Sequence, residues 1–258
     1  MFAWTPDPTG EVAHRPWPLP RSPWIMSQRW TDLLFAHWPI EPGVLRSLVP
    51  SSLPLDTFDG TAWVSIASFQ LSHLRPHWLP ALPVISAFPE LNVRTYVTLG
   101  GKAGVYFFSL DAGSALAVAG ARATYHLPYF NARAQIRTDA AGFVAYESHR
   151  IDPRGKSADF RARYRATGPV AFAIPGSLDH WLTERYCLYA TDHAERVYRA
   201  EIHHHRWPLQ PAEAIIDENT MALAAGLRLP AIAQRLAFSS SLDVVVWAPT
   251  RIDGAPNG

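Results

Sequence analysis

The sequence is poor in the side chains that thiol and amine chemistry require. It contains one cysteine, Cys187, so a framework of disulfides within the chain is excluded. Only two lysines are present, Lys102 and Lys156, and every other basic residue except histidine is an arginine. A reaction that proceeds through a lysine Schiff base therefore has two candidate side chains, besides the terminal amine.

Long apolar runs and a strong net charge are also lacking. No apolar stretch approaches the roughly 18 residues that a membrane-spanning helix needs. The N-terminal stretch MFAWTPDPTGEVAHRPWPLP does not have the basic start and apolar centre of a secretory signal. A net charge of +1 gives no electrostatic reason to expect nucleic acid or a membrane surface as a partner. We therefore expect a soluble, cytoplasmic protein, which a single cysteine also fits.

The residues that are present predict one large domain behind an irregular arm. Hydrophobic residues make up 48% of the 258 residues and charged residues 17%, which is enough to build a sizeable core. Residues 1–25 hold six prolines and three tryptophans without any periodicity, and we interpret them as an irregular arm. We expect residues 26–258 to form a single domain.

Strand signals dominate that domain. Helices are predicted over 28–36, 40–50, 114–125 and 177–186. Gly100–Gly101 and Ala140–Ala141 join pairs of strands as hairpins. Many antiparallel strands with few helices predict a mainly β (α+β) barrel or sandwich rather than a doubly wound fold. Alternating or apolar runs predict strands over 61–71, 92–99, 103–111, 132–139, 142–150, 158–168, 196–207 and 242–249.

The stretch PELNVRTYV, residues 89–97, carries the first candidate site. Glu90, Asn92, Arg94 and Tyr96 share one face if this stretch is extended. Four such side chains on one face would suit a site inside a barrel, where an arginine can bind a carboxylate through two hydrogen bonds. The alternative is a solvent-facing polar side, which half-exposed strands commonly have. The preceding proline-rich stretch 72–89 either covers the mouth of a pocket or packs as a surface loop.

A run of three histidines, 203–205, is the second candidate. On a strand, His203 and His205 project to one face and could share a metal ion. No HxxxE or CxxC stretch nearby supplies further ligands, and exposed or packed histidines are the simpler interpretation. We therefore expect no metal and no other cofactor. Four other histidines would complete a site only if the fold brought them together: His37, His73, His77 and His126.

Several long motifs in order resemble the uncharacterised bacterial YqjF-like family. The resemblance covers the chain from about Trp30 to about Val246 and lies in FAHWPIEPGVLRSLVP, LPLDTFDGTAWVSIASF, SAFPELNVRTYV, GVYFFSLDA and HLPYFNAR. That family is similar to the acetoacetate decarboxylase-like proteins. The resemblance implies a closed β-barrel of mostly antiparallel strands with a small central cavity and a few helices packed outside.

The same resemblance implies a reaction that this chain lacks the means to perform. The decarboxylase motif is a helix of small residues followed by glycine, an aromatic residue, proline and two lysines. Here GARATYHLPYFNAR has the helix and the proline, with Tyr129 and Phe130 where the lysine pair would stand. Neither side chain can form a Schiff base. Lys102 and Lys156 lie in turn-like stretches where we expect them to be solvated, so acetoacetate decarboxylation is disfavoured.

Three functional hypotheses remain open. The first is a barrel that binds a small, partly apolar carboxylate or carbonyl compound. The second is a metal-assisted lyase or hydrolase that uses His203 and His205. The third is a structural or interaction protein whose arm docks on a neighbouring subunit of a homo-oligomer. For the first hypothesis, the candidate ligand-binding residues are Glu90, Asn92, Arg94, Tyr96, Arg122, His126 and Tyr129.

Overall fold

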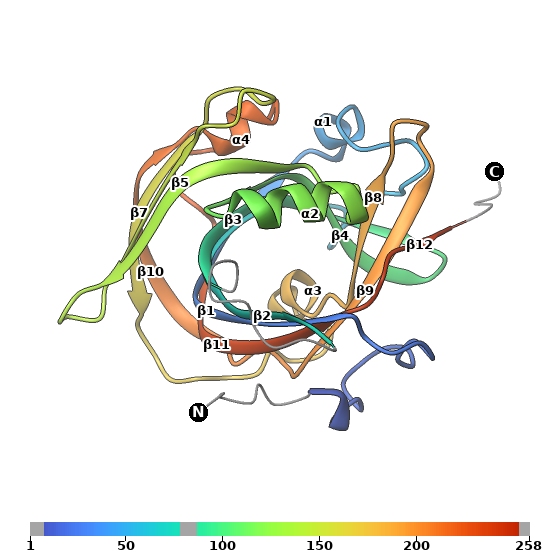
Figure 1. The fold of residues 1–258 in the computed structure, drawn as a ribbon. Coiled ribbons are helices and arrows are strands. Elements are labelled where there is room, and N and C mark those ends of the chain that lie inside the picture. Colours follow the sequence, from blue (N-terminus) through green and yellow to red (C-terminus); the bar gives the residue numbers. More distant parts are fainter. Residues whose placement is uncertain (1–7, 78–86, 253–258) are drawn as a thin grey trace.

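The computed structural model describes residues 8–77 and 87–252, and Figure 1 shows their strands arranged as a ring with α2 and α3 inside its outline. The helices are η1 (Pro8–Gly10), α1 (Pro42–Arg46), α2 (Ala115–Tyr125), α3 (Leu178–Thr183) and α4 (Met221–Ala224). The strands are β1 (Met26–Ile40), β2 (Ala62–Pro76), β3 (Phe88–Leu99), β4 (Lys102–Ala112), β5 (Tyr129–Thr138), β6 (Val144–Arg150), β7 (Asp159–Ala166), β8 (Cys187–Thr191), β9 (Val197–His204), β10 (Gln210–Asn219), β11 (Arg235–Val246) and β12 (Thr250–Arg251). None of the helices within these ranges is long and apolar enough to cross a membrane.

Hydrogen bonding between strands closes the sheet into a barrel. The ring runs through β4, β3, β2, β1, β11, β10, β7, β6 and β5, and the pairing of β5 with β4 completes it. A second ring shares part of this sheet. It is closed by the pairing of β11 with β9, of β9 with β8, and of β8 with β4. Strand β4 pairs in parallel with β5 and β8, whereas the neighbouring pairs in the shared part of the sheet are antiparallel. The predicted closed, mainly β barrel is confirmed.

Strands β4, β3, β2, β1 and β11 belong to both closures, and β3 is buried on both faces from Glu90 to Val97. On β3, Leu91 and Val93 point to one side and join a core with Tyr146 and Phe160 from β6 and β7. The opposite side of the same strands joins a second core with β8, β9, α2 and α3. A strand between two cores has no solvent-facing side, and its polar residues must be buried as well.

Irregularities in the long strands decide which side chains face each core. Strand β1 shifts register against β2 between Thr31 and Leu34, and Asp32 there has a φ of 51°. Trp30 before the bulge and Leu33 after it consequently join the same core, although strict alternation would separate them. Bulges of this kind let one strand curve around a barrel without turning its apolar residues outward.

The structure departs from the predicted elements in a few places. Residues 28–36, predicted as a helix, belong to β1, whose middle is buried on both faces and so shows no strand-like alternation. Strands β8 and β10 and helix α4 were not predicted. Strand β2 continues to Pro76, and residues 78–86, half of the predicted cover segment 72–89, lie outside the described residues.

The described part of the N-terminal arm lies against its own barrel. Arg15 and Trp17 both donate hydrogen bonds to the Glu201 carboxylate on β9. Further along, the indole of Trp247 donates to the carbonyl of Ser22 at 2.7 Å. These contacts attach the arm to β9 and to the end of β11 within one chain.

Gly104 provides a test of the close approach between β4 and β8. A Cβ atom at this position would lie 2.7 Å from both the carbonyl oxygen and the Sγ of Cys187. We expect Gly104→Ala to lower the free energy of unfolding by about 1–3 kcal/mol, because the two strands would have to separate. Urea denaturation followed by circular dichroism measures this.

The matched control is Gly120→Ala in α2, where a Cβ meets no atom within 4 Å. This change should raise the free energy of unfolding by about 0.5–1 kcal/mol, since glycine costs backbone entropy in a helix. Equal stability of the two variants would contradict the close approach.

Candidate functional site

A cavity of about 300 Å³ lies between the shared strands, β8 and β9, with α2 over one side. Most of its wall is apolar and comes from the second core, including several aromatic rings. Its polar lining is small by comparison and is concentrated on β3 and around α3. Besides two tryptophan indoles, the polar side chains in the lining are Gln28, Glu90, Asn92, Arg94, Thr124, Tyr125, Tyr129, Thr183, Arg185 and His204.

Strand β3 presents three of these polar groups in succession. Glu90, Asn92 and Arg94 alternate with Leu91 and Val93 and all three line the cavity. Their exposed fractions are 4%, 4% and 9%. The interpretation of this face as a solvent-facing polar side is therefore wrong, because the second closure of the barrel covers it.

The guanidinium of Arg94 has no acidic partner in the described part of the chain. It forms no ion pair within the described ranges 8–77 and 87–252, and its Nε atom is buried without a hydrogen bond. Its neighbours are the ring of Phe35, 5.1 Å away, and the hydroxyl of Tyr96. Burial lowers the pKa of Arg94, but an arginine stays charged in proteins. A positive charge thus sits in the cavity wall without a counter-charge from the described chain.

Arg185, the other lining arginine, is neutralised. It ends the segment after α3 and its Nη1 donates to the Asp56 carboxylate at 2.6 Å. Its Nε donates to the carbonyl of Trp181. The contrast with Arg94 shows that the fold supplies a carboxylate for one cavity arginine and leaves the other unpaired.

Glu90 and Tyr129 form a pair inside the cavity. The hydroxyl of Tyr129 donates a hydrogen bond of 3.0 Å to Glu90 Oε2. Burial raises the pKa of Glu90 to about 7, although the bond from Tyr129 acts in the opposite direction. Burial and the neighbouring Glu90 also hold the pKa of Tyr129 well above its usual value. Near neutral pH, Glu90 can therefore both release and accept a proton.

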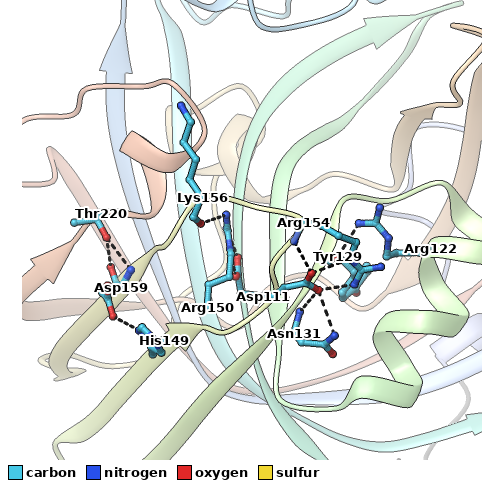
Figure 2. Close-up of polar contacts among 11 residues, drawn as sticks. Asp111, Arg122, Tyr129, Asn131, His149, Arg150, Arg154, Lys156, Asp159 and Thr220 are labelled. Carbon is cyan, nitrogen blue, oxygen red and sulfur yellow. Dashed lines mark hydrogen bonds and ion pairs between the residues drawn. The ribbon is translucent and has the colours of Figure 1, made fainter.

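The aromatic pair Tyr129 and Phe130 divides between two environments. Tyr129 begins β5 and points into the cavity, while Phe130 is not part of the lining. Phe130 instead packs on Arg150, whose guanidinium lies 4.1 Å from the ring centre and pairs with buried Asp111. Figure 2 shows this Arg150–Asp111 pair and, separately, Arg122 donating to the backbone carbonyl of Tyr129. Only the first residue of the pair can contact a ligand in the cavity.

The other predicted site residues do not line the cavity. Tyr96 is fully buried beside it, with its hydroxyl 3.3 Å from His37 Nδ1. Arg122 lies on α2 and is engaged with the Tyr129 backbone, 2.8 Å away. His126 ends that helix with a φ of 55° and packs its ring against Tyr198. Tyr96 and Arg122 thus contact the lining residues Arg94 and Tyr129 without forming part of the wall, whereas His126 contacts Tyr198, which does not line the cavity.

Several lining residues were not predicted from the sequence. His204 lines the cavity, whereas its neighbours do not: His203 lies on the opposite side of β9, and His205 follows the end of the strand. Arg185 and the indoles of Trp30 and Trp207 also line it, and both indole nitrogens are buried without a partner. Alternation along β9 was visible in the sequence, but nothing indicated which side of the strand faces the cavity.

The histidine run is not assembled as a metal site. His203 bonds to the Pro8 carbonyl at 3.1 Å and stacks on His14, while His205 lies 3.4 Å from Glu11 near the surface. Within the described ranges, no group of three or more His, Cys, Asp or Glu side chains is placed to hold a metal ion.

Neither lysine belongs to the cavity lining. Lys102 forms an ion pair with Glu201, next to the N-terminal arm. The carbonyl of Lys156 accepts a bond from Arg150, and Figure 2 shows its side chain extending away from Tyr129.

The raised pKa of Glu90 predicts a pH-dependent stability. Because folding raises this pKa from 4.5 to about 7, the folded protein holds a proton that the unfolded chain has already lost. The contribution of Glu90 is therefore present below about pH 4.5 and is lost as the pH rises through about 7. Relative to Glu90→Gln, wild type should lose about 2–3 kcal/mol of unfolding free energy between about pH 5 and pH 8.

Urea denaturation of both proteins at the two pH values measures this difference. Glu213→Gln is the control, because Glu213 is exposed on β10 and pairs with Arg165 on the barrel surface. A pH slope shared by wild type and Glu90→Gln would show that Glu90 does not titrate in this range.

Solved structures with the same architecture confirm the fold. An acetoacetate decarboxylase-like enzyme from Sphingomonas wittichii RW1 is similar with a TM-score of 0.62 and 14% identity, over 96% of this chain and 97% of that chain. The enduracididine biosynthesis enzyme MppR in complex with pyruvate is similar with a TM-score of 0.60 and 12% identity, over 95% and 94% of the two chains. At these identities the similarity establishes the acetoacetate decarboxylase-like fold alone.

Sequence comparison establishes the family. The chain is 48% identical over 231 residues to the uncharacterised protein YqjF of Bacillus subtilis (strain 168), covering 89% of this chain and 93% of that protein. Residues 27–243 match the model of DUF2071, a family described as an uncharacterised conserved protein. The chain therefore belongs to this YqjF-like family, and its members can be expected to share the barrel described above.

Proposed function

We propose that this protein binds a small, partly apolar carboxylate or carbonyl compound in the barrel cavity, with a carboxylate at Arg94. The observation that carries the proposal is the buried guanidinium without an acidic partner in the described chain. An unpaired buried charge costs several kcal/mol, which a bound anion with suitable hydrogen bonds would offset. The planar guanidinium is suited to holding a carboxylate through two parallel hydrogen bonds.

The rest of the cavity wall supports the partly apolar character of the ligand. Leu33, Phe69 and Phe107 are typical of the lining, which has few polar groups away from β3 and α3. The indoles of Trp30 and Trp207 each offer an N–H that has no partner within residues 8–77 and 87–252. The cavity would therefore accommodate a ligand with one polar end and an apolar body. The indole N–H groups would be available to a carbonyl oxygen of that ligand.

Binding would proceed without a covalent bond to the protein. Lys102 and Lys156 are the only lysines of the chain, and neither lines the cavity. The similar enzyme MppR is described in complex with pyruvate, a small keto acid, which supports the ligand class proposed here. Acetoacetate decarboxylation through a Schiff base is not part of the proposal.

Isothermal titration with 4-phenylbutanoate tests the proposal, because this probe combines a carboxylate with an apolar body. We expect wild type to bind it, and Arg94→Ala to bind about 10- to 100-fold more weakly, since a charge-assisted pair contributes about 1.5–3 kcal/mol. The control ligand, 4-phenylbutan-1-ol, lacks the carboxylate and should bind both proteins equally. Arg161→Ala, at an exposed arginine of β7, is the control variant.

Identical affinity of wild type and Arg94→Ala for 4-phenylbutanoate would contradict the role of Arg94. Binding of the alcohol as tightly as the acid would contradict the selection of a carboxylate.

A second prediction concerns stability without ligand. Arg94→Met keeps much of the side-chain volume and removes the unpaired charge. We expect it to raise the free energy of unfolding by about 1–3 kcal/mol, as replacements of buried charges by apolar residues often do. Thermal denaturation of the ligand-free proteins measures the change. A marked loss of stability would mean that Arg94 has a partner in the folded protein and is not reserved for a ligand.

A further inference from the structure

We propose that the cavity catalyses proton transfer at a carbon next to a carbonyl group, with Glu90 as the base and Tyr129 as the hydroxyl that stabilises the enolate oxygen. The inference rests on the proposed function, because the substrate is a keto acid whose carboxylate is held by Arg94. It adds a reaction class and two catalytic residues to a binding site.

The first support is the arrangement of the pair. The Tyr129 hydroxyl lies 3.0 Å from Glu90 Oε2, and both side chains line the same cavity as Arg94. Within the described ranges, Tyr129 provides the single recorded hydrogen bond to this carboxylate. The second oxygen of Glu90 therefore remains available to a ligand. A buried carboxylate that is not tied to a cation is suited to accepting a proton from carbon.

The second support is the contrast with the other buried carboxylate of this region. Asp111, on the neighbouring strand β4, is paired with Arg150 through two hydrogen bonds of 2.6 and 2.8 Å. Phe130 covers that pair from the other side. Among the described residues, the fold thus neutralises Asp111 with a cation and gives Glu90 only a neutral tyrosine. A purely structural carboxylate would be stabilised better by the arrangement that Asp111 has.

The third support is the position of Glu90 relative to Arg94. Three residues of extended strand lie between them, and the four residue steps place their Cα atoms about 13 Å apart. Both side chains line the same cavity, so a keto acid held at Arg94 can approach Glu90 through the carbon next to its carbonyl group.

The chemical step balances without any further reactant. The Glu90 carboxylate takes a proton from the carbon adjacent to the carbonyl, and the C–H electron pair forms a C=C bond. The carbonyl π electrons move to oxygen. Protonated Glu90 then donates to the Tyr129 oxygen, which frees the Tyr129 hydroxyl to donate to the enolate oxygen. Return of a proton from Glu90 to carbon restores the keto form.

Hydrogen–deuterium exchange at carbon tests the proposal. The probe is 4-oxo-4-phenylbutanoate in D₂O, with loss of the C3 proton signal followed by NMR. We expect wild type to accelerate exchange at C3 by about 10²–10⁴-fold over buffer. Glu90→Gln should return the rate to that of buffer, and Tyr129→Phe should lower it by about 10- to 1,000-fold.

Titration of the same variants with 4-phenylbutanoate, which has no carbonyl group, separates binding from chemistry. Both variants should bind it within about threefold of wild type, since neither change removes Arg94. Binding by wild type without accelerated exchange would overturn the inference and leave the proposed function standing. Absence of binding by wild type would overturn both. Exchange by Glu90→Gln at the wild-type rate would overturn the role of Glu90.

A second variant protects the test from misfolding. Glu90→Asp keeps a carboxylate but withdraws it by one methylene. Slower exchange with unchanged binding of 4-phenylbutanoate would support the inference, and an unchanged exchange rate would overturn it.

The pH profile of the exchange rate adds a readout that a structural role of Glu90 would not give. The rate should rise with an inflection near the pKa of Glu90, about 7. The surrounding tyrosines, Tyr129 and Tyr146, have pKa values held well above their usual value, and Asp111 is paired with Arg150.

Discussion

Five strands, β4, β3, β2, β1 and β11, each belong to two closed rings of the sheet, and the rest of this structure depends on that constraint. Strand β4 pairs with both β5 and β8, and β11 pairs with both β10 and β9, so the sheet closes twice. The strands between them contribute side chains to both cores. On β3, where Glu90 to Val97 are all buried, polar residues cannot reach bulk water, and each must be hydrogen-bonded, paired with a charge, or kept for a ligand.

The polar residues near the cavity differ in how they meet this requirement. Asp111 and Arg150 neutralise each other, and Arg185 is held by Asp56. Arg94 has no such partner among the described residues, and Glu90 has only a tyrosine. The fold therefore stabilises most of its buried charges internally and leaves two unbalanced groups in one cavity wall. Burial alone would not indicate a site. The lack of a counter-charge at Arg94 and Glu90 in the described chain, among buried charges that are otherwise paired, is what supports a binding and proton-transfer site.

Much of the architecture was predictable from local sequence. The turn at Gly100–Gly101 and the turn near Ala140–Ala141 set the β3–β4 and β5–β6 hairpins, both of which the structure confirms. Helix α2 begins after Ser114, whose side chain accepts a bond from the backbone of Ala117. Strand β1 was mistaken in part for a helix because burial on both faces removes the alternation that identifies a strand.

The amino-acid sequence alone indicated most of the strands and two hairpins of a mainly β barrel, the shared face of Glu90, Asn92 and Arg94, and the lack of a Schiff-base lysine after α2. These depend on neighbouring residues, since side chains two apart on a strand share a face whatever the rest of the chain does. Only the tertiary structure decided that this face is a cavity wall, that His204 rather than His203 lines it, and that Tyr129 meets Glu90. Those outcomes depend on bulges and on pairings between distant strands, which fix the direction of a side chain through contacts that no local pattern contains.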